Sequence, residues 1–112
     1  MKLSKMMLLA VALMALVSGS AMAAGDAAAG EEKSQACAAC HGAAGVSAVT
    51  TFPILAGQFE DYLFNALSQY KLGTRKNAIM SGIAAGLSKQ DMHDLAAYYT
   101  SLEGVYSLNL PE

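Results

Sequence analysis

The hydrophobic pattern divides the 112 residues into an apolar leader and a body of amphipathic segments. Residues 6–17 form an unbroken apolar run, which is too short to cross a bilayer of about 30 Å as a helix. Two lysines precede the run, and Ala21-Met22-Ala23 after it has the small-x-small form that signal peptidase cleaves. We therefore interpret residues 1–23 as a cleaved signal peptide and residues 24–112 as the mature domain. An uncleaved membrane anchor is the alternative.

Two amphipathic helices are predicted in the second half of the chain. The first covers residues 58–72 and is followed by Gly73, a residue that often ends helices. Its apolar stripe consists of Phe59, Tyr62, Leu63, Ala66, Leu67 and Tyr70. The second opens at Ser88-Lys89-Gln90-Asp91, which resembles a capping box, and ends before Gly104. Its apolar side consists of Met92, Leu95, Ala96, Tyr99 and Leu102. Both stripes are expected to face a core.

A third helix is predicted from an N-cap at Asp26 to the cysteines at positions 37 and 40. Its inner face consists of the small residues Ala27, Gly30 and Ser34. Such a face would let another helix cross closely, whereas a solvent-exposed alanine-rich helix is the alternative. Residues 42–57 and 74–87 carry glycines and polar residues and are expected to be loops. The sequence therefore predicts one all-α domain with three main helices and long loops.

The net charge of the sequence argues against one class of partner. The hydrophobic fraction of 54% is inflated by the leader. Residues 24–112 contain five basic and nine acidic residues, so their formal charge is −4, which argues against a nucleic-acid partner. A domain of this size often depends on a disulfide, a metal or a cofactor for part of its stability.

Both cysteines of the sequence lie in the motif Cys37-Ala38-Ala39-Cys40-His41. A disulfide within this motif would close a very short loop and contribute little stability. A dithiol oxidoreductase would place such a pair between a strand and a helix, and the sequence has almost no strand pattern. A zinc site would need further ligands, for which only His93 and scattered carboxylates are present.

The same spacing meets the requirements for covalent attachment of a haem. The two cysteines are about one helical turn apart, so both can form thioethers with the vinyl groups of one ring. The adjacent histidine is then placed to bind the iron. We therefore predict one haem c held by Cys37 and Cys40, with His41 as its proximal ligand.

Two methionines of the mature part are candidates for the opposite side of the iron. Met80 lies in the loop-like segment 74–87, from which its side chain can reach a ring held by the first helix. Met92 lies in the apolar stripe of a predicted helix and is expected to fill the core. We predict Met80 as the sixth ligand, which would close the coordination sphere and raise the reduction potential. A methionine that only covers the haem edge is the alternative.

Other polar residues carry weaker signals. His93 lies beside the apolar stripe of the last helix, and a solvated surface position is expected for it. Lys71, Arg75 and Lys76 form a small basic cluster close to the Met80 segment. This cluster is suited to a docking edge or to a contact with a haem propionate, and a simply solvated group of charges is the alternative.

From residue 25 to residue 104 the chain resembles the class I cytochromes c, and within them the single-domain cytochrome c553 group and each half of the dihaem cytochromes c4. The matching segments are Cys37-Ala38-Ala39-Cys40-His41-Gly42, Phe52-Pro53-Ile54-Leu55-Ala56-Gly57-Gln58, Tyr70-Lys71-Leu72-Gly73, Met80-Ser81-Gly82 and Leu87-Ser88 with Leu95-Ala96-Ala97-Tyr98-Tyr99. The ordered combination is specific, although many haem proteins share the cysteine motif alone.

The resemblance implies the class I cytochrome c fold wrapped around one covalent haem. Cys37 and Cys40 would carry the thioether links, and His41 and Met80 would bind the iron. Pro53 would accept a hydrogen bond from the other ring nitrogen of His41 through its carbonyl oxygen, which orients the imidazole. The first and last helices would cross at close range. A dihaem cytochrome c4 would continue into a second domain, whereas this sequence is expected to form one.

The predicted function is that of a periplasmic electron carrier that moves single electrons, rather than an enzyme. Its expected partners are redox proteins: a membrane cytochrome complex, a terminal oxidase or reductase, or a dehydrogenase. Stable membrane insertion after signal cleavage is not expected. One alternative is a haem protein with an open or labile sixth site that binds a small ligand, as a sensor or peroxidase does. Another is an electron-transfer subunit of an oxidoreductase.

Overall fold

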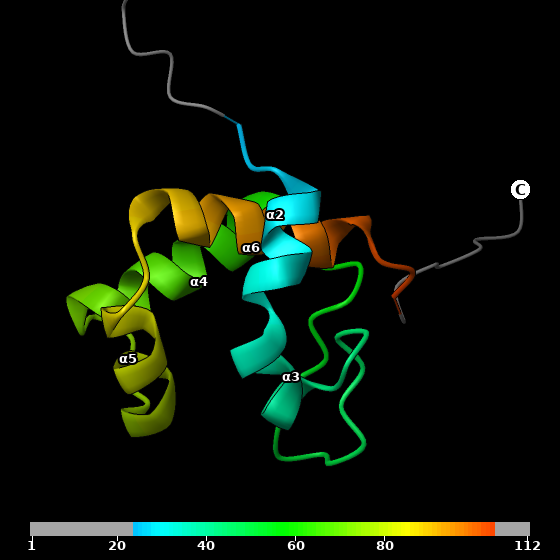
Figure 1. The fold of residues 1–112 in the computed structure, drawn as a ribbon. Coiled ribbons are helices and arrows are strands. Elements are labelled where there is room, and N and C mark those ends of the chain that lie inside the picture. Colours follow the sequence, from blue (N-terminus) through cyan, green and yellow to red (C-terminus); the bar gives the residue numbers. More distant parts are fainter. Residues whose placement is uncertain (1–23, 105–112) are drawn as a thin grey trace, which may run out of the picture.

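The computed structural model describes residues 24–104, which fold into five helices joined by loops (Figure 1). The helices are α2 (Ala27–Lys33), α3 (Gln35–His41), α4 (Glu60–Leu72), α5 (Ala78–Ala85) and α6 (Lys89–Ser101). No strand occurs in this range, which confirms the all-α class. Within it, no helix has the length and apolar content needed to span a membrane. The signal peptide expected for residues 1–23 lies outside the described residues.

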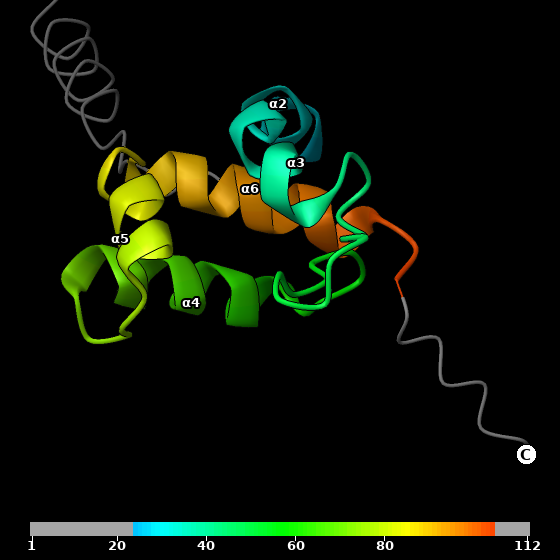
Figure 2. The same cartoon turned by 90° about the horizontal axis from the view of Figure 1, so that it is seen from below.

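Helix α6 is the central element of the domain. In Figure 2 it lies between α4 on one side and α2 on the other, and it packs against both. The buried core at these contacts consists of Leu63, Leu95, Ala96, Tyr98 and Tyr99. Helices α3 and α5 project from the same side of the α4–α6 pair (Figure 1). Helices α3 and α5 are therefore held apart by the layer that α2, α4 and α6 form.

The crossing of α2 and α6 is as close as the small residues of the first helix predict. Gly30 is buried, and a Cβ atom at this position would overlap the backbone carbonyl of Asp94 and the side chain of Tyr98. Any larger residue would push the two helices apart. The expectation of a helix that crosses on the small-residue face is therefore confirmed.

Asp94 is a buried carboxylate that joins the start of the domain to α6. Its Oδ1 accepts hydrogen bonds from the backbone N–H of Asp26 at 2.8 Å and from Nε2 of Gln90 at 2.8 Å. Its Oδ2 pairs with Nζ of Lys33 at 2.5 Å. The Lys33 hydrogen bond, followed by the Asp26 amide, lowers the pKa of Asp94 to about 2. The carboxylate is thus ionised and fully paired inside the helix crossing.

The predicted first helix is divided in two. Asp26 is its N-cap as expected, with the side chain accepting hydrogen bonds from the N–H groups of Ala28 and Ala29. At Ser34, however, both the backbone N–H and Oγ bond to the carbonyl oxygen of Glu31, and the regular helix is interrupted there. Serine side chains that bond to the preceding turn compete with the helical pattern in this way. The break lets α3 leave the direction of α2.

The two other predicted helices are confirmed, with one correction at the start of α4. Helix α4 begins at Glu60, so Phe59 is its N-cap residue and is 81% exposed. The expectation that Phe59 belongs to the buried stripe was wrong, because the residue precedes the first turn. Helix α6 has the predicted capping box between Ser88 and Asp91, and Met92 is buried in the core as expected.

The expectation that residues 74–87 form a loop was wrong, since they contain α5, a short helix in addition to the three predicted ones. Asn77 caps this helix by accepting a hydrogen bond from the N–H of Met80 at 3.0 Å. The glycines at 82 and 86 suggested a loop, but neither needs a left-handed conformation. An asparagine N-cap before an apolar stretch was the signal that could have revealed this helix.

His93 differs from its expected solvated position. Its ring stacks on Phe64 of α4, with 4.0 Å between the ring centroids and 10° between the planes. The side chain is therefore partly buried between α6 and α4. This position follows from the packing of two helices, which the pattern along one helix does not contain.

Replacing Asp94 by Asn should destabilise the domain by about 2 kcal/mol, since the amide cannot pair with Lys33 and leaves buried donors unsatisfied. Folding lowers the pKa of Asp94 from 3.8 to about 2, so its ionised form stabilises the fold at neutral pH. This contribution is lost as the pH falls from about 4 toward 2. Thermal denaturation of the mature protein across this pH range measures both effects.

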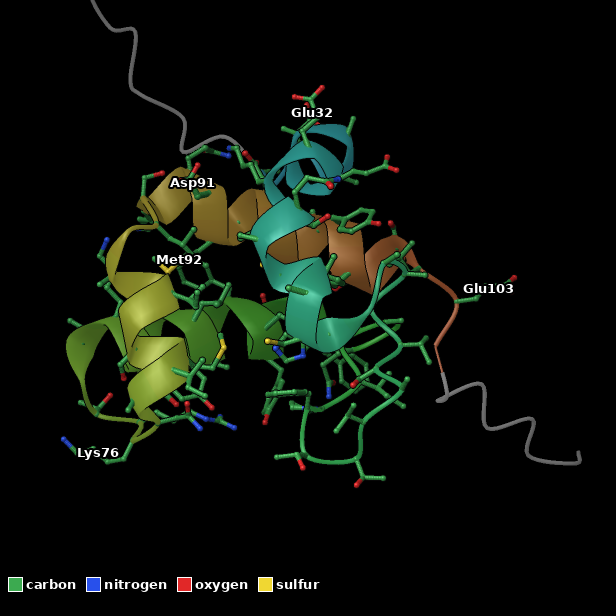
Figure 3. The ribbon with its side chains drawn as sticks, turned by 60° about the horizontal axis from the view of Figure 1, so that its bottom comes forward. Glu32, Lys76, Asp91, Met92 and Glu103 are labelled. Atoms are coloured by element: carbon green, nitrogen blue, oxygen red, sulfur yellow. The ribbon has the colours of Figure 1, made fainter. Side chains whose placement is uncertain are left out.

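Glu32→Gln is the matched control, because Glu32 is exposed on α2 and points into solvent (Figure 3). We expect the control to keep the wild-type dependence of stability on pH and Asp94→Asn to lose part of it. Equal slopes in the wild type and Asp94→Asn would contradict the role assigned to this carboxylate.

Candidate functional site

A cavity of about 740 Å³ lies between α3 and α5, with residues of α4, α6 and the loop 47–58 completing its wall. Figure 1 shows these two helices on opposite sides of the space below α4 and α6. Among the described residues that line the cavity, none is Asp, Glu, Lys or Arg. Its volume falls within the range of cofactor sites, roughly 300 to 1,000 Å³. The cavity is therefore suited to a large and mainly apolar group.

Helix α3 presents the cysteine motif to this cavity. Cys37, Cys40 and His41 all line it, and the two cysteines are free thiols. Burial raises the pKa of the Cys37 thiol. A thiol with a raised pKa is a poor nucleophile, so Cys37 lacks the character of a reactive oxidoreductase cysteine.

The imidazole of His41 is held in one orientation. The residue is 6% exposed, and its Nδ1 lies 2.7 Å from the carbonyl oxygen of Pro53. Because a carbonyl oxygen can only accept, Nδ1 carries the hydrogen and donates a hydrogen bond to the Pro53 carbonyl oxygen. The lone pair of Nε2 is then available to a metal ion. The ring of Phe52 contacts His41 edge-on, at 6.4 Å between centroids.

Backbone hydrogen bonds hold the loop that carries Pro53 in place. The N–H groups of Leu55 and Ala56 donate to the carbonyl oxygen of Gly45 at 2.8 and 3.1 Å. Gly45 has a positive φ of 71°, and a Cβ there would also meet the ring of Tyr99. Beyond the loop, the N–H of Gly57 donates to the Tyr99 carbonyl oxygen at 2.9 Å. These bonds join the histidine side of the cavity to α6, and the predicted loop over residues 42–57 is confirmed.

Met80 reaches the cavity from the opposite side. It lies in the first turn of α5, is partly buried and lines the cavity together with Ile79 and Ile83. The Asn77 cap therefore acts directly on the turn that carries the methionine. The structure thus brings the five residues expected at the site, Cys37, Cys40, His41, Pro53 and Met80, to one cavity.

The residues present fit a covalently held haem. The two thiols and the histidine share one helix, a thioether lies on another wall, and the remaining lining is largely apolar. A structural zinc site is a poorer fit, because it takes four protein ligands and the described lining of the cavity offers only Cys37, Cys40 and His41 among His, Cys, Asp and Glu.

An all-α fold around such a cavity, with Cys-x-x-Cys-His on one wall, defines a protein that carries haem c. The family model described as "Cytochrome c" matches residues 27–103. The chain belongs to the cytochrome c family, and haem c bound through Cys37 and Cys40 is its cofactor.

Relatives refine the position within the family. The chain is 49% identical over 85 residues to cytochrome c4 of Pseudomonas aeruginosa, which covers 76% of this chain and 42% of that protein. It is 47% identical over 83 residues to cytochrome c-554(548) of Halomonas halodenitrificans, which covers 71% of this chain and 100% of the relative. It is also 42% identical over 77 residues to the thiosulfate dehydrogenase electron acceptor of Thiomonas intermedia, over 68% of this chain and 36% of that protein.

Among solved structures, reduced recombinant cytochrome c4 from Pseudomonas stutzeri superimposes with a TM-score of 0.69 at 44% identity. The match covers 72% of this chain and 47% of that one. The chain is therefore a class I cytochrome of the c4-like type, as the sequence resemblance indicated. It spans less than half the length of the cytochrome c4 relatives that it matches.

Replacing Asn77 by Ala should lower the stability of the mature protein by about 1 kcal/mol, because the first turn of α5 loses its side-chain acceptor. Asn77→Asp is the matched control, since a carboxylate can accept the same hydrogen bond from the N–H of Met80. Denaturant titration of both variants checks this expectation. Equal stabilities of Asn77→Ala and Asn77→Asp would show that the cap does not stabilise α5.

Proposed function

We propose that the protein is a periplasmic carrier of single electrons, in which His41 and Met80 bind the haem iron from opposite sides. The observation that carries this proposal is the cavity, which His41 enters from α3 and Met80 from α5. Haem c supplies the reversible one-electron chemistry when it is bound. The protein supplies both ligands, excludes water from one apolar site and keeps the ligands fixed.

His41 and Pro53 would set the electronic character of the iron. With Nδ1–H donating to the Pro53 carbonyl oxygen, the imidazole is more electron-rich at Nε2 than a free histidine. This offsets part of the upward effect that a methionine ligand has on the reduction potential. Pro53 acts here through its backbone carbonyl, so its side chain is needed only for the shape of the loop.

We also propose that the protein is exported and that its partners are redox proteins. Residues 1–23 would be removed as a signal peptide, and the domain 24–112 would act in the periplasm. Its partners would be redox proteins: a dehydrogenase or a membrane cytochrome complex as donor, and a terminal oxidase or reductase as acceptor. The resemblance to the thiosulfate dehydrogenase electron acceptor of Thiomonas intermedia supports a redox enzyme as one such donor. We place the protein among carriers or electron-transfer subunits rather than among enzymes with a substrate of their own.

Met80→Ala should abolish the weak near-infrared band of ferric iron bound to a thioether and should open the sixth position to CO. The reduction potential should fall by on the order of 100 mV, because axial ligands set haem potentials over a range of about 0.8 V. Absorption spectra and redox titration of the oxidised and reduced mature protein measure these changes.

Met92→Leu is the control for this experiment, since Met92 is 5% exposed in the core between α4 and α6 and lies near Ser68. It should keep the band and the potential of the wild type. If the wild type itself lacks the band and binds CO readily, the protein is a ligand-binding haem protein, and the carrier proposal is wrong.

Intact-mass measurement of the exported protein should give a chain that starts at Ala24 and carries one haem. The reason is that Ala21-Met22-Ala23 provides the small residues that signal peptidase requires. Fractionation should place this species in the periplasm. A haem-bearing chain that still starts at Met1 and sediments with membranes would instead indicate an uncleaved anchor.

A further inference from the structure

The last described residues of the chain are fixed against the loop that precedes α4. A Cβ atom on Gly104 would lie 2.0 Å from the carbonyl oxygen of Ala56, so the two backbones are in direct contact. Earlier in the chain, Oγ1 of Thr100 donates a hydrogen bond to the carbonyl oxygen of Gln58 at 2.8 Å. Figures 1 and 2 both show the end of α6 beside this loop. The chain therefore leaves the described domain at a definite place, over residues 56–58.

Two apolar side chains next to this place are largely exposed within the described part of the chain. Phe59 directly follows residues 56–58 and is 81% exposed, and Val46 is 49% exposed. Val46 follows Gly45, whose carbonyl oxygen accepts a hydrogen bond from the N–H of Ala56 at 3.1 Å. Both side chains therefore lie close to the point at which the chain leaves the domain.

The residues after Gly104 have the sequence pattern of an extended segment with one apolar side. They read Val105-Tyr106-Ser107-Leu108-Asn109-Leu110-Pro111-Glu112 and lie outside the described range. Apolar residues at 106, 108 and 110 alternate with Ser107 and Asn109. A period of two residues is typical of an extended chain that covers an apolar surface with one side and faces water with the other.

The reach of this segment matches the position of Phe59. An extended chain advances by about 3.3 to 3.6 Å per residue, so residues 105–108 span up to about 13 Å. Phe59 comes two residues after Gly57, a separation of at most about 7 Å, and the backbone of Gly57 also contacts Gly104. The apolar side of the segment can therefore lie on the Phe59 ring without any change in the described domain.

The attachment of the segment also favours it over a separate partner. A short tether gives an effective concentration in the millimolar range, which a free protein at ordinary concentrations does not reach. Residues 105–112 contain no Lys or Arg, and Glu60 and Asp61 beside Phe59 are acidic. An ion pair therefore cannot hold the segment here, and the contact has to be apolar.

We propose that residues 105–110 fold back over Phe59 and Val46 and dock there with their apolar side on these two side chains. In this position the segment covers residues 56–58, which continue the loop that carries Pro53. It thereby holds in place the loop whose carbonyl oxygen orients His41. The inference goes beyond the proposed function and does not rest on it, because docking requires neither a particular iron ligand nor export.

The first test is a double-mutant cycle on the mature holoprotein, made of Phe59→Ala, Leu108→Ser and the two combined. The side chain of Phe59 makes no capping hydrogen bond to α4, so its loss leaves the helix start unchanged. Each single variant should lower the thermal midpoint by about 4 °C or more, since a contact of ordinary strength shifts a domain of this size by that amount. The combined variant should fall little further, because both changes remove the same contact.

The matched controls are Leu72→Ala and Asn109→Ser. Leu72 is also a largely exposed apolar residue, but it lies at the opposite end of α4. Asn109 lies on the polar side of the segment, next to Leu108. Exposed residues without a partner contribute little to stability, so both controls should keep the wild-type midpoint.

A second test measures access to the segment directly. Chymotrypsin cleaves after Tyr106, and its rate on a folded protein follows the fraction of molecules in which the segment is undocked. Phe59→Ala should accelerate this cleavage by about threefold or more, whereas Leu72→Ala should leave it unchanged. Intact-mass measurement over time gives the rate.

Several outcomes would overturn the inference. One is a Phe59→Ala protein with the midpoint and the cleavage rate of the wild type. Another is additive effects of Phe59→Ala and Leu108→Ser, because residues that do not touch behave additively. A loss on Phe59→Ala that depends on protein concentration would show that a second copy covers Phe59 instead. Absorption spectra of the same samples report the iron ligands separately, so intact methionine ligation without docking overturns this inference alone.

Discussion

The close crossing of α2 and α6 is the contact on which the rest of the molecule depends. It requires Gly30, because a side chain there would collide with α6, and it is closed by the buried Asp94 carboxylate. Helix α3 follows α2 directly, so the crossing also determines where the cysteine motif lies relative to α6. On its other face, α6 contributes Leu95 and Tyr99 to the cavity wall. One helix contact thus joins the two ends of the domain and positions one side of the site.

The cavity explains how a domain of this size can hold a functional site with so few polar groups. Much of the space that a larger protein would fill with core side chains is left to the cofactor, whose attachment to α3 makes it part of the core. The polar contacts are few and each is fixed by backbone: the Pro53 carbonyl orients His41, and Asn77 caps the turn that carries Met80. Under the proposed ligation by His41 and Met80, residues held in this way would change little in position between two oxidation states, which suits the transfer of an electron.

Several features of the protein are local in sequence, and the sequence predicts them. The spacing of Cys37, Cys40 and His41 already places all three on one helical segment, whatever the fold around them. The caps of α2 and α6 depend on side chains within three residues of the bonds they make. The apolar stripes of α4 and α6 follow from helical periodicity, so both helices were predicted with ends correct to within about two residues.

Other features depend on residues that are distant in sequence, and only the tertiary structure decided them. The Asp94 carboxylate accepts a hydrogen bond from the backbone N–H of Asp26, 68 positions earlier, and the stacking of His93 on Phe64 joins two helices. Helix α5 was missed because its glycines suggest a loop. Arg75 contacts the rings of Tyr62 and Tyr70 because the turn after α4 reverses the chain. Short-range patterns record which turns a segment can form. They contain no information on which distant segment will supply the partner, because that depends on how all the helices pack together.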